Sequence, residues 1–238
     1  MLRRVRYSRL AQRCLAQVRP AQDLVSAHAT HYYYQQSYRA EEHLYWAHLP
    51  GWIAAFAAAH PIAAALDVGC AYGTLLVYAM RAARCAGYAL DFKDTYLSRG
   101  LIESMPIEFA VANIELDPIP WSRRFDLILF TETIEHLNFQ AAPTLTKLHE
   151  ALSPGGRLFL STPNSADWGR NLKYYRSYSE LPSPEQSRRG VVVDDHVWHF
   201  NRAELEGLLH ESGFRIQRLK QSPGVGGRHF NIEARRAD

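Results

Sequence analysis

Short apolar runs alternate with segments of helical periodicity from residue 40 onward. Runs of this length that are bounded by turn residues are typical of buried strands. The strand-like runs cover residues 63–69, 87–91, 107–112, 125–130 and 157–162, and the helix-like segments cover 40–61, 74–84, 94–104, 142–153 and 201–214. Strands that alternate with helices favour a parallel sheet with helices on both faces.

The rest of the chain breaks this alternation. Residues 215–220 and 228–236 are joined by a glycine-rich turn, which predicts a terminal hairpin. Residues 165–199 are polar and aromatic without a clear period, which is typical of a loop that covers a binding site. We therefore expect an α/β fold with a doubly wound sheet over residues 38–238, an insertion at 165–199 that acts as a lid, and a basic N-terminal tail or lid over 1–37.

The positive charge of the chain is concentrated at its start. Six of the 27 Lys and Arg residues lie among the first twenty residues, which contain no Asp or Glu, and the remaining 21 face 24 acidic residues. An arginine-rich, acid-free start is the composition of a mitochondrial transit segment or of a basic tail, and we favour the tail. Since the remaining chain has no basic surplus with which to neutralise phosphates, we expect no DNA partner.

The cysteines and the apolar stretches indicate in which cellular compartment the protein works. Cys14, Cys70 and Cys85 give an odd count without CxxC spacing, which argues against a disulfide framework and a thiolate zinc site. The most apolar stretch, residues 52–66, is broken by a histidine and a proline and is shorter than the ~20 residues that a membrane-spanning helix needs. We expect a soluble cytoplasmic protein with no membrane span.

A glycine loop and an acidic residue predict a cofactor site. Gly69 and Gly73 follow the first predicted strand, where a ligand can approach a backbone that has no Cβ. Asp91 ends the second predicted strand, where a carboxylate can accept hydrogen bonds from ribose hydroxyls. Ala71 and Thr74 break the nicotinamide fingerprint G-x-G-x-x-G, which disfavours an NAD-dependent oxidoreductase.

The same residues carry a resemblance to a known family. The segment LDVGCAYG resembles the D-x-G-x-G-x-G first motif of class I S-adenosylmethionine (SAM) dependent methyltransferases, with Ala71 replacing the middle glycine. ANIELDPIPW resembles the segment that flanks the adenine, with Asn113 where aspartate is usual, and FDLILFTETIEHL and LSPGGRLFLSTPN resemble the fourth and fifth strand segments. The cofactor-binding residues that this resemblance implies are Asp67, Gly69, Cys70, Ala71, Gly73, Asp91, Phe92, Asn113, Ile114 and Thr131.

The resemblance covers about residues 62–234 and extends to the fold and the activity. It implies a Rossmann-like sheet of seven strands, in which the last strand is antiparallel and lies beside the fifth. It also implies an enzyme that transfers a methyl group from SAM.

The segment TETIEHLN supplies candidate chemistry at the end of the fourth predicted strand. Glu132, Glu135 and His136 lie there, at the carboxyl edge of the sheet where α/β proteins bind ligands. If a helical turn begins at Glu132, the three side chains share one face and can bind a divalent metal or position a general base. We take these three residues as the candidate catalytic residues.

This segment resembles two groups of methyltransferases, and its sequence does not choose between them. It is similar to the small-RNA 3′-terminal ribose 2′-O-methyltransferases, which implies Glu132, Glu135, His136 and His196 as ligands of a divalent metal such as Mg or Mn. The E-x-x-E-H pattern also occurs in methyltransferases that resemble the ubiquinone-pathway and sugar-tailoring enzymes. His199 shares a face with Val197 in an extended segment, so we expect it to be structural.

The function that we expect is O-methylation of a small molecule or glycan. One alternative is a metal-dependent ribose 2′-O-methyltransferase that acts on RNA 3′ ends, and another is a non-catalytic SAM-binding domain. Aromatic residues gather at 32–46 and again at 168–198. They are expected either to wall the acceptor site or to pack the N-terminal segment onto the domain.

Overall fold

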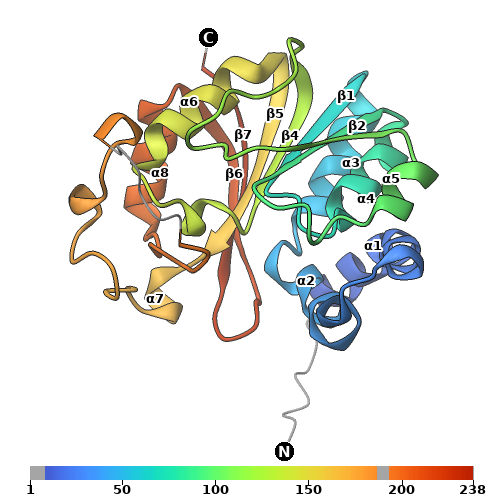
Figure 1. Ribbon diagram of the computed structural model, residues 1–238, viewed down its shortest axis with the longest axis horizontal. Coiled ribbons are helices and arrows are strands. Elements are labelled where there is room, and N and C mark those ends of the chain that lie inside the picture. The colour runs from blue at the N-terminus through green and yellow to red at the C-terminus, as the bar shows by residue number, and fades with distance from the viewer. Residues whose placement is uncertain (1–8, 187–192, 238) are drawn as a thin grey trace, which may run out of the picture.

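Seven strands form one sheet in the order β3-β2-β1-β4-β5-β7-β6 (Figure 1). The computed structural model describes residues 9–186 and 193–237, so the first eight residues of the predicted tail and residues 187–192 of the predicted insertion lie outside the described residues. The strands are β1 (Ala64–Val68), β2 (Ala86–Asp91), β3 (Ile107–Val111), β4 (Phe125–Thr131), β5 (Leu152–Pro163), β6 (Phe214–Ser222) and β7 (His229–Arg236).

Strand direction follows the predicted pattern. Strands β1 to β5 pair in parallel, while β7 runs antiparallel between β5 and β6. The predicted seven-stranded doubly wound sheet with an antiparallel last strand beside the fifth is therefore confirmed. Parallel pairing also brings the carboxyl ends of β1, β2 and β4 to the same edge of the sheet, where ligands bind in such folds.

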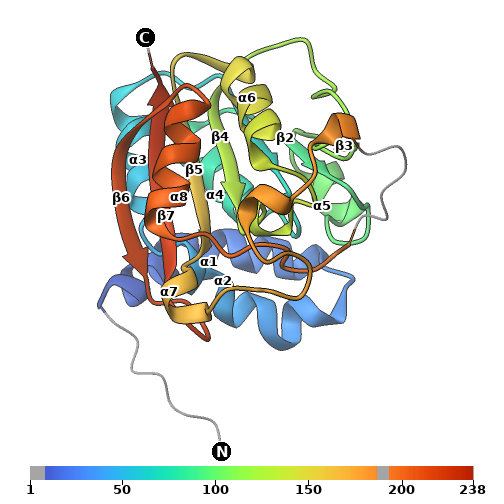
Figure 2. The same ribbon diagram turned by 90° about the vertical axis from the view of Figure 1, so that its left-hand side faces the viewer.

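Helices cover both faces of the sheet. Helices α3 and α4 pack on one face with a buried core that includes Leu76 and Phe159, and α6 and α8 pack on the other with a core that includes Leu145 and Phe230 (Figures 1 and 2). None of the helices that the structure describes is long and apolar enough to cross a bilayer. The helices are α1 (Arg9–His28), α2 (Arg39–Tyr45), α3 (Leu49–Ala59), α4 (Thr74–Ala83), α5 (Arg99–Ser104), α6 (Ala141–Ala151), α7 (Ser165–Trp168) and α8 (Arg202–Glu211).

Part of the predicted tail is a helix of the folded domain. Helix α1 spans Arg9–His28 and buries an apolar stripe against the neighbouring helices. The stripe recurs every three or four residues, which is helical spacing that the many arginines and Pro20 obscured in the sequence. The tail prediction is therefore wrong for this segment. The buried stripe consists of Ala11, Cys14, Val18, Ala21 and Val25.

The single helix predicted over residues 40–61 is also wrong. Helix α2 ends at Tyr45, because the backbone of Trp46 leaves helical geometry with φ −124° and ψ 38°. Helix α3 begins at Leu49, and Pro50 occupies its first turn, where a missing N–H costs nothing. The break lets α2 turn toward the carboxyl edge of the sheet while α3 packs on its face (Figure 1).

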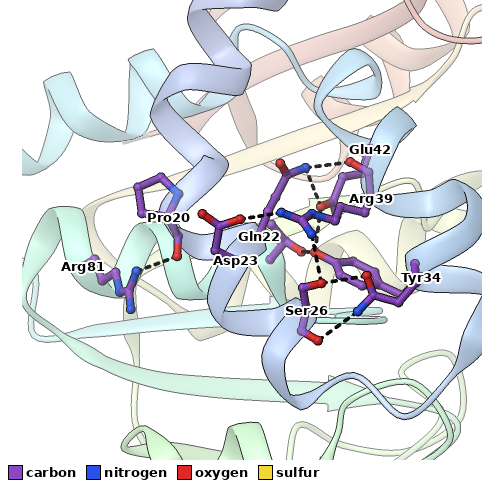
Figure 3. Close-up of polar contacts among 10 residues, drawn as sticks. Pro20, Gln22, Asp23, Ser26, Tyr34, Arg39, Glu42 and Arg81 are labelled. Atoms are coloured by element: carbon purple, nitrogen blue, oxygen red, sulfur yellow. Dashed lines mark hydrogen bonds and ion pairs between the residues drawn. The ribbon is translucent and has the colours of Figure 1, made fainter.

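A buried polar cluster fastens α1 and the turn before α2 to α4. Gln22 Nε2 donates to Glu42 Oε1 at 3.0 Å, and the Tyr34 hydroxyl contacts the same oxygen at 3.2 Å (Figure 3). The Tyr34 hydroxyl also lies 3.1 Å from Thr74 Oγ1, at the start of α4. Burial raises the pKa of Glu42 to about 7, an effect that these hydrogen bonds only partly offset. The cluster thus joins the N-terminal helices to the residue that follows the glycine loop.

We predict that Tyr34→Phe destabilises the protein. The substitution keeps the buried ring but removes the hydroxyl that donates to Glu42 and contacts Thr74, and the loss of these buried hydrogen bonds costs about 1–3 kcal/mol. Tyr32→Phe is the matched control, because Tyr32 is 68% exposed. Urea unfolding measures both free energies of unfolding, and equal stabilities for the two variants would show that the buried hydroxyl contributes nothing.

Candidate functional site

The loop between β1 and α4 is closely packed against the end of β4. Gly69 has φ +73°, and a Cβ at this position would lie 2.3 Å from Thr133 Oγ1. The Gly69 N–H donates to the carbonyl oxygen of Leu90 at 2.8 Å, which ties the loop to the end of β2. Because only a residue without a side chain fits here, the loop presents bare backbone to the space above the sheet.

Two carboxylates lie behind this loop. Asp91 is 4% exposed, and its Oδ2 accepts the Ala71 N–H at 3.0 Å. Burial raises the pKa of Asp91, and burial followed by repulsion from Asp91 raises the pKa of Asp67 to about 8. Asp67 Oδ1 is buried without a hydrogen-bond partner among the described residues. Asp91 lines the cavity, and a buried acidic group there suits a ligand that carries hydroxyl groups.

A cavity of about 390 Å³ opens at this edge of the sheet. Of the ten predicted cofactor-binding residues, four do not line it: Asp67 and Cys70 are buried beside Asp91, Gly73 faces Leu97, and Thr131 lies within β4. The six that line the cavity are Gly69, Ala71, Asp91, Phe92, Asn113 and Ile114.

Aromatic side chains form much of the remaining wall. They come from the segment before α2, from α2 itself, from the loop before α4, from the segment between β2 and α5, and from α7 in the insertion. The sequence has aromatic residues at 32–46 and 168–198, but it does not decide between a wall and a packing role for them. Several of them line the cavity in the structure. There, their apolar rings can stack on a planar acceptor and their polar groups can hydrogen-bond a polar one. The aromatic lining residues are Tyr33, Tyr38, Tyr45, Tyr72, Phe92, Tyr96 and Trp168.

The predicted acidic and histidine residues line the same cavity. Glu135 is fully buried and accepts the Thr162 hydroxyl at 2.9 Å through Oε2. Its Oε1 and the His136 Nδ1 atom are buried without hydrogen-bond partners in the described part of the chain. Ligand atoms of Glu135, His136 and His196 lie within 4.8 Å of one another. These three atoms can converge on one ligand atom or one cation.

His196 comes from the insertion, and backbone hydrogen bonds bring it to this place. The Glu135 carbonyl oxygen accepts the N–H of Val197 at 2.7 Å and that of Trp198 at 3.1 Å. The end of the insertion is thereby held against the turn that carries Glu135 and His136. No spacing along the chain could have predicted this contact, because it joins segments about sixty residues apart.

His199 determines which nitrogen of His196 is free. Its Nδ1 lies 2.8 Å from the carbonyl oxygen of Gly169, which can only accept, so this nitrogen carries the proton. With its proton on Nδ1, His199 then accepts through Nε2 from His196 Nδ1 at 2.8 Å. Nε2 of His196 is left with its lone pair available to a ligand. His199, which was predicted to be structural, therefore positions a residue of the site.

The pKa shifts leave this part of the cavity rich in neutral groups. Burial, followed by repulsion from Glu132, raises the pKa of Glu135 well above its ordinary value. Burial lowers the pKa of His136, and burial with the neighbouring His136 and His199 lowers the pKa of His196 to about 4. Neutral imidazoles can act as bases or as metal ligands, and a cation bound here would drive the Glu135 proton off.

Glu132 is not one of the three converging ligands, although it lies close enough to Glu135 to raise the pKa of that carboxyl. The turn that begins with Glu132 is not helical there, since Glu132 has φ +50° and the 3₁₀ turn covers only Ile134–His136. Its Oε2 atom lies 2.7 Å from Nδ1 of His229, at the start of β7. His229 also lines the cavity, which the sequence did not predict, because a single histidine at a strand start carries no signal.

The family follows from a comparison with known proteins. Residues 8–219 match the model of a family described as a methyltransferase domain. This match spans most of the chain, which belongs to that family and is a SAM-dependent methyltransferase. The bare backbone at Gly69 and the Asp91 carboxyl, which both line the cavity, fit such a cofactor, because its ribose carries hydroxyl groups. The chain matches no curated protein significantly.

Solved structures show the same fold. A 1,6-didemethyltoxoflavin N1-methyltransferase from Burkholderia thailandensis has a TM-score of 0.64 and 19% identity, and the match covers 98% of this chain and 93% of that one. A SAM-dependent methyltransferase from Mesorhizobium loti has a TM-score of 0.56 and 20% identity, covering 76% and 96%. The N-methyltransferase NodS from Bradyrhizobium japonicum, in complex with S-adenosyl-L-homocysteine, has a TM-score of 0.57 and 12% identity, covering 93% and 99%.

We predict that Gly69→Ala abolishes cofactor binding. The new Cβ would collide with Thr133 and would strain a backbone with φ +73°, so the loop must move. Gly155→Ala is the matched control, because Gly155 has φ +79° but open space where its Cβ would stand, with no neighbouring side chain within 4 Å. Titration calorimetry with S-adenosyl-L-homocysteine should show binding lost in the first variant and retained in the second. Unchanged affinity in Gly69→Ala would mean that this loop does not contact the nucleoside.

Proposed function

We propose that this methyltransferase methylates a hydroxyl oxygen of a small molecule or glycan and that it works in the cytoplasm. The observation that supports this proposal is the set of buried polar atoms without partners among the described residues: Glu132 Oε1, Glu135 Oε1 and His136 Nδ1. All three residues line the cavity that also contains Gly69 and Asp91. Buried acceptor atoms without partners are costly, so a site that retains them is suited to a hydroxylated ligand.

The cavity residues divide into two groups in this proposal. Asp91 would bind the ribose hydroxyls of SAM, while Asn113, Ile114 and Phe92 would contact its adenine. SAM supplies a methyl group that is already activated by its sulfonium. The protein's own task is to align the acceptor oxygen with that methyl group, to exclude water and to accept the hydroxyl proton. Glu132, Glu135 and His136 are the groups near enough to the acceptor side to do so.

A transfer screen tests the proposal. Enzyme and methyl-labelled SAM are incubated with phenols, quinone precursors, glycans, amines and RNA, and the methylated atom is identified by mass spectrometry and NMR. O-methylation of a hydroxylated small molecule or glycan is the expected result. Exclusive N-methylation, which the names of the NodS and toxoflavin enzymes describe, would overturn the choice of oxygen. Binding of S-adenosyl-L-homocysteine without transfer to any acceptor would favour the non-catalytic alternative.

We predict that His136→Gln lowers kcat by about 100-fold or more, the usual contribution of a general acid or base. The amide keeps hydrogen-bonding capacity but cannot accept a proton. Its affinity for S-adenosyl-L-homocysteine should stay within a few-fold of the wild type. An unchanged kcat in this variant would remove His136 from the acceptor chemistry.

A second candidate function is metal-dependent 2′-O-methylation of RNA 3′ ends. The observation in its favour is the convergence of Glu135, His136 and His196, with Nε2 of His196 left unprotonated. Together these residues would bind a divalent cation, which would supply a Lewis acid for the two hydroxyls of a terminal ribose. Two imidazoles suit Mn better than Mg, which prefers oxygen ligands.

Metal binding can be measured without knowing the acceptor. We predict that the wild type binds one Mn per chain in calorimetry and releases a proton on binding, because Glu135 must ionise. Glu135→Gln should lose this binding, whereas Glu103→Gln, at an exposed position on α5, should retain it. Absence of metal binding in the wild type, or equal transfer to RNA ending in a ribose and in a 2′-deoxyribose, would reject this second function.

A further inference from the structure

A short loop after β3 forms one wall of the cavity. Residues 112–115 of this loop line the cavity together with Asp91. The loop is a tight turn that its own polar groups hold closed. The Asn113 N–H donates to Asp117 Oδ2 at 2.8 Å, and Asn113 Oδ1 accepts the Glu115 N–H at 2.9 Å. The Asp117 N–H also donates to the Asn113 carbonyl oxygen, at 2.7 Å.

Lys147 on α6 binds this loop from outside the cavity. Its Nζ atom donates to the carbonyl oxygens of Ile114 at 2.7 Å, Asp117 at 2.8 Å and Glu115 at 3.1 Å. An ammonium group has three protons, and these three carbonyl oxygens can accept all of them. Lys147 itself does not line the cavity. It therefore contacts the wall through the backbone only.

The surroundings of Lys147 differ from those of the lysines near the insertion. Lys93 and Lys173 form ion pairs with carboxylates that are largely exposed. The Lys147 ammonium is partly buried, and burial lowers its pKa, although the charges of Asp117 and Glu115 partly offset this shift. Burying a charge is costly unless it is hydrogen-bonded, so this ammonium depends on the three carbonyl groups as much as they depend on it.

Glu115 attaches the same loop to the turn that follows β4. Its side chain is buried, and its two oxygens accept the N–H groups of Asn138 at 3.0 Å and Phe139 at 2.8 Å. The loop is thus held from two directions, by α6 through Lys147 and by this turn through Glu115. Removal of the Lys147 ammonium should therefore displace the loop without releasing it.

We propose that Lys147 is a positioning residue for the cofactor, which holds residues 112–115 at the distance from Gly69 and Asp91 that the nucleoside of SAM requires. The proposal rests on the part of the proposed function that places the adenine against Asn113 and Ile114. It does not depend on the acceptor or on the atom that is methylated. Lys147 acts on binding only through the three carbonyl groups that it orients.

Titration calorimetry with S-adenosyl-L-homocysteine tests the role of Lys147. Lys147→Met keeps an unbranched side chain but has no donor, and we expect it to lower the affinity about tenfold, because hydrogen bonds from a charged group are lost. Lys220→Met, at an exposed position on β6, is the matched control. It should bind like the wild type, since surface substitutions away from a site have little effect. Wild-type affinity in Lys147→Met would overturn the proposal.

Hydrogen exchange measures the position of the loop without any ligand. The amides of Asn113, Glu115 and Asp117 are hydrogen-bonded within the loop, so they should exchange slowly in the wild type. In Lys147→Met they should exchange faster, while the amides of β1 and β4 keep their wild-type rates. The same slow exchange in the variant would contradict the proposal, because Lys147 would then not hold the loop.

A loss of stability could also weaken cofactor binding, and a core variant separates the two causes. Ile53→Ala removes a fully buried side chain from α3, on the face of the sheet opposite α6. It should lower the free energy of unfolding and leave the affinity for S-adenosyl-L-homocysteine nearly unchanged. If it lowers that affinity as much as Lys147→Met does, the affinity reports only the stability of the domain, and the proposal fails.

Chemical rescue supplies the last test. Lys147→Cys followed by aminoethylation rebuilds an ammonium on a side chain of nearly the same length. The natural cysteines Cys14, Cys70 and Cys85 are buried, and wild type treated with the same reagent is the control. The modified variant should regain most of the lost affinity, and an affinity no better than that of Lys147→Met would overturn the proposal. If binding depends on Lys147 but no hydroxylated acceptor is methylated, the proposed O-methylation fails while this inference stands.

Discussion

The left-handed turn at Glu132 is the constraint on which the site depends. Where β4 ends, the left-handed backbone of Glu132 places Thr133 against Gly69. It also directs the Glu132 side chain toward His229. The following 3₁₀ turn then carries Glu135 and His136 toward the insertion. A cofactor loop, a carboxylate and a cluster of neutral ligand atoms are therefore set by the geometry of one short segment. Such strain persists only where the surrounding structure holds it, which here is the ladder between β4 and β5.

The site contains several buried polar atoms that have no hydrogen-bond partner among the described residues. Elsewhere in the described chain, buried acidic groups such as Glu42 and Glu115 accept hydrogen bonds from side chains or backbone. On the acceptor side, Glu135 Oε1 and His136 Nδ1 have no partner among the described residues. A protein rarely leaves such atoms buried and unpaired, because each costs about 1–3 kcal/mol. The contrast separates groups that stabilise the domain from groups that are free to meet a ligand.

The sequence predicted what depends on order along the chain. The run from β1 through Gly69 to Asp91 appears in the structure as predicted, because a strand, a tight turn and the next strand are local features with clear residue signals. Helix α1 was missed because its apolar stripe is made of small residues among arginines. The pairing of His196 with His136 was implied only by the resemblance to the RNA methyltransferases, because no spacing along the chain fixes it. The pairing of His229 with Glu132 was not predicted, since it joins segments far apart in sequence and leaves no motif.

The bond between the Tyr34 hydroxyl and Thr74 has a consequence for how the domain can be shortened. A chain cut back to residue 38 would retain Asp91 and every acidic or histidine residue of the cavity, yet it would lack the phenol that reaches the first residue of α4. Glu42 would remain buried with fewer donors. The methyltransferase core recognisable by its motifs is thus smaller than the unit that folds with its nucleoside loop in place, so domain boundaries drawn from motifs alone would cut into the working enzyme.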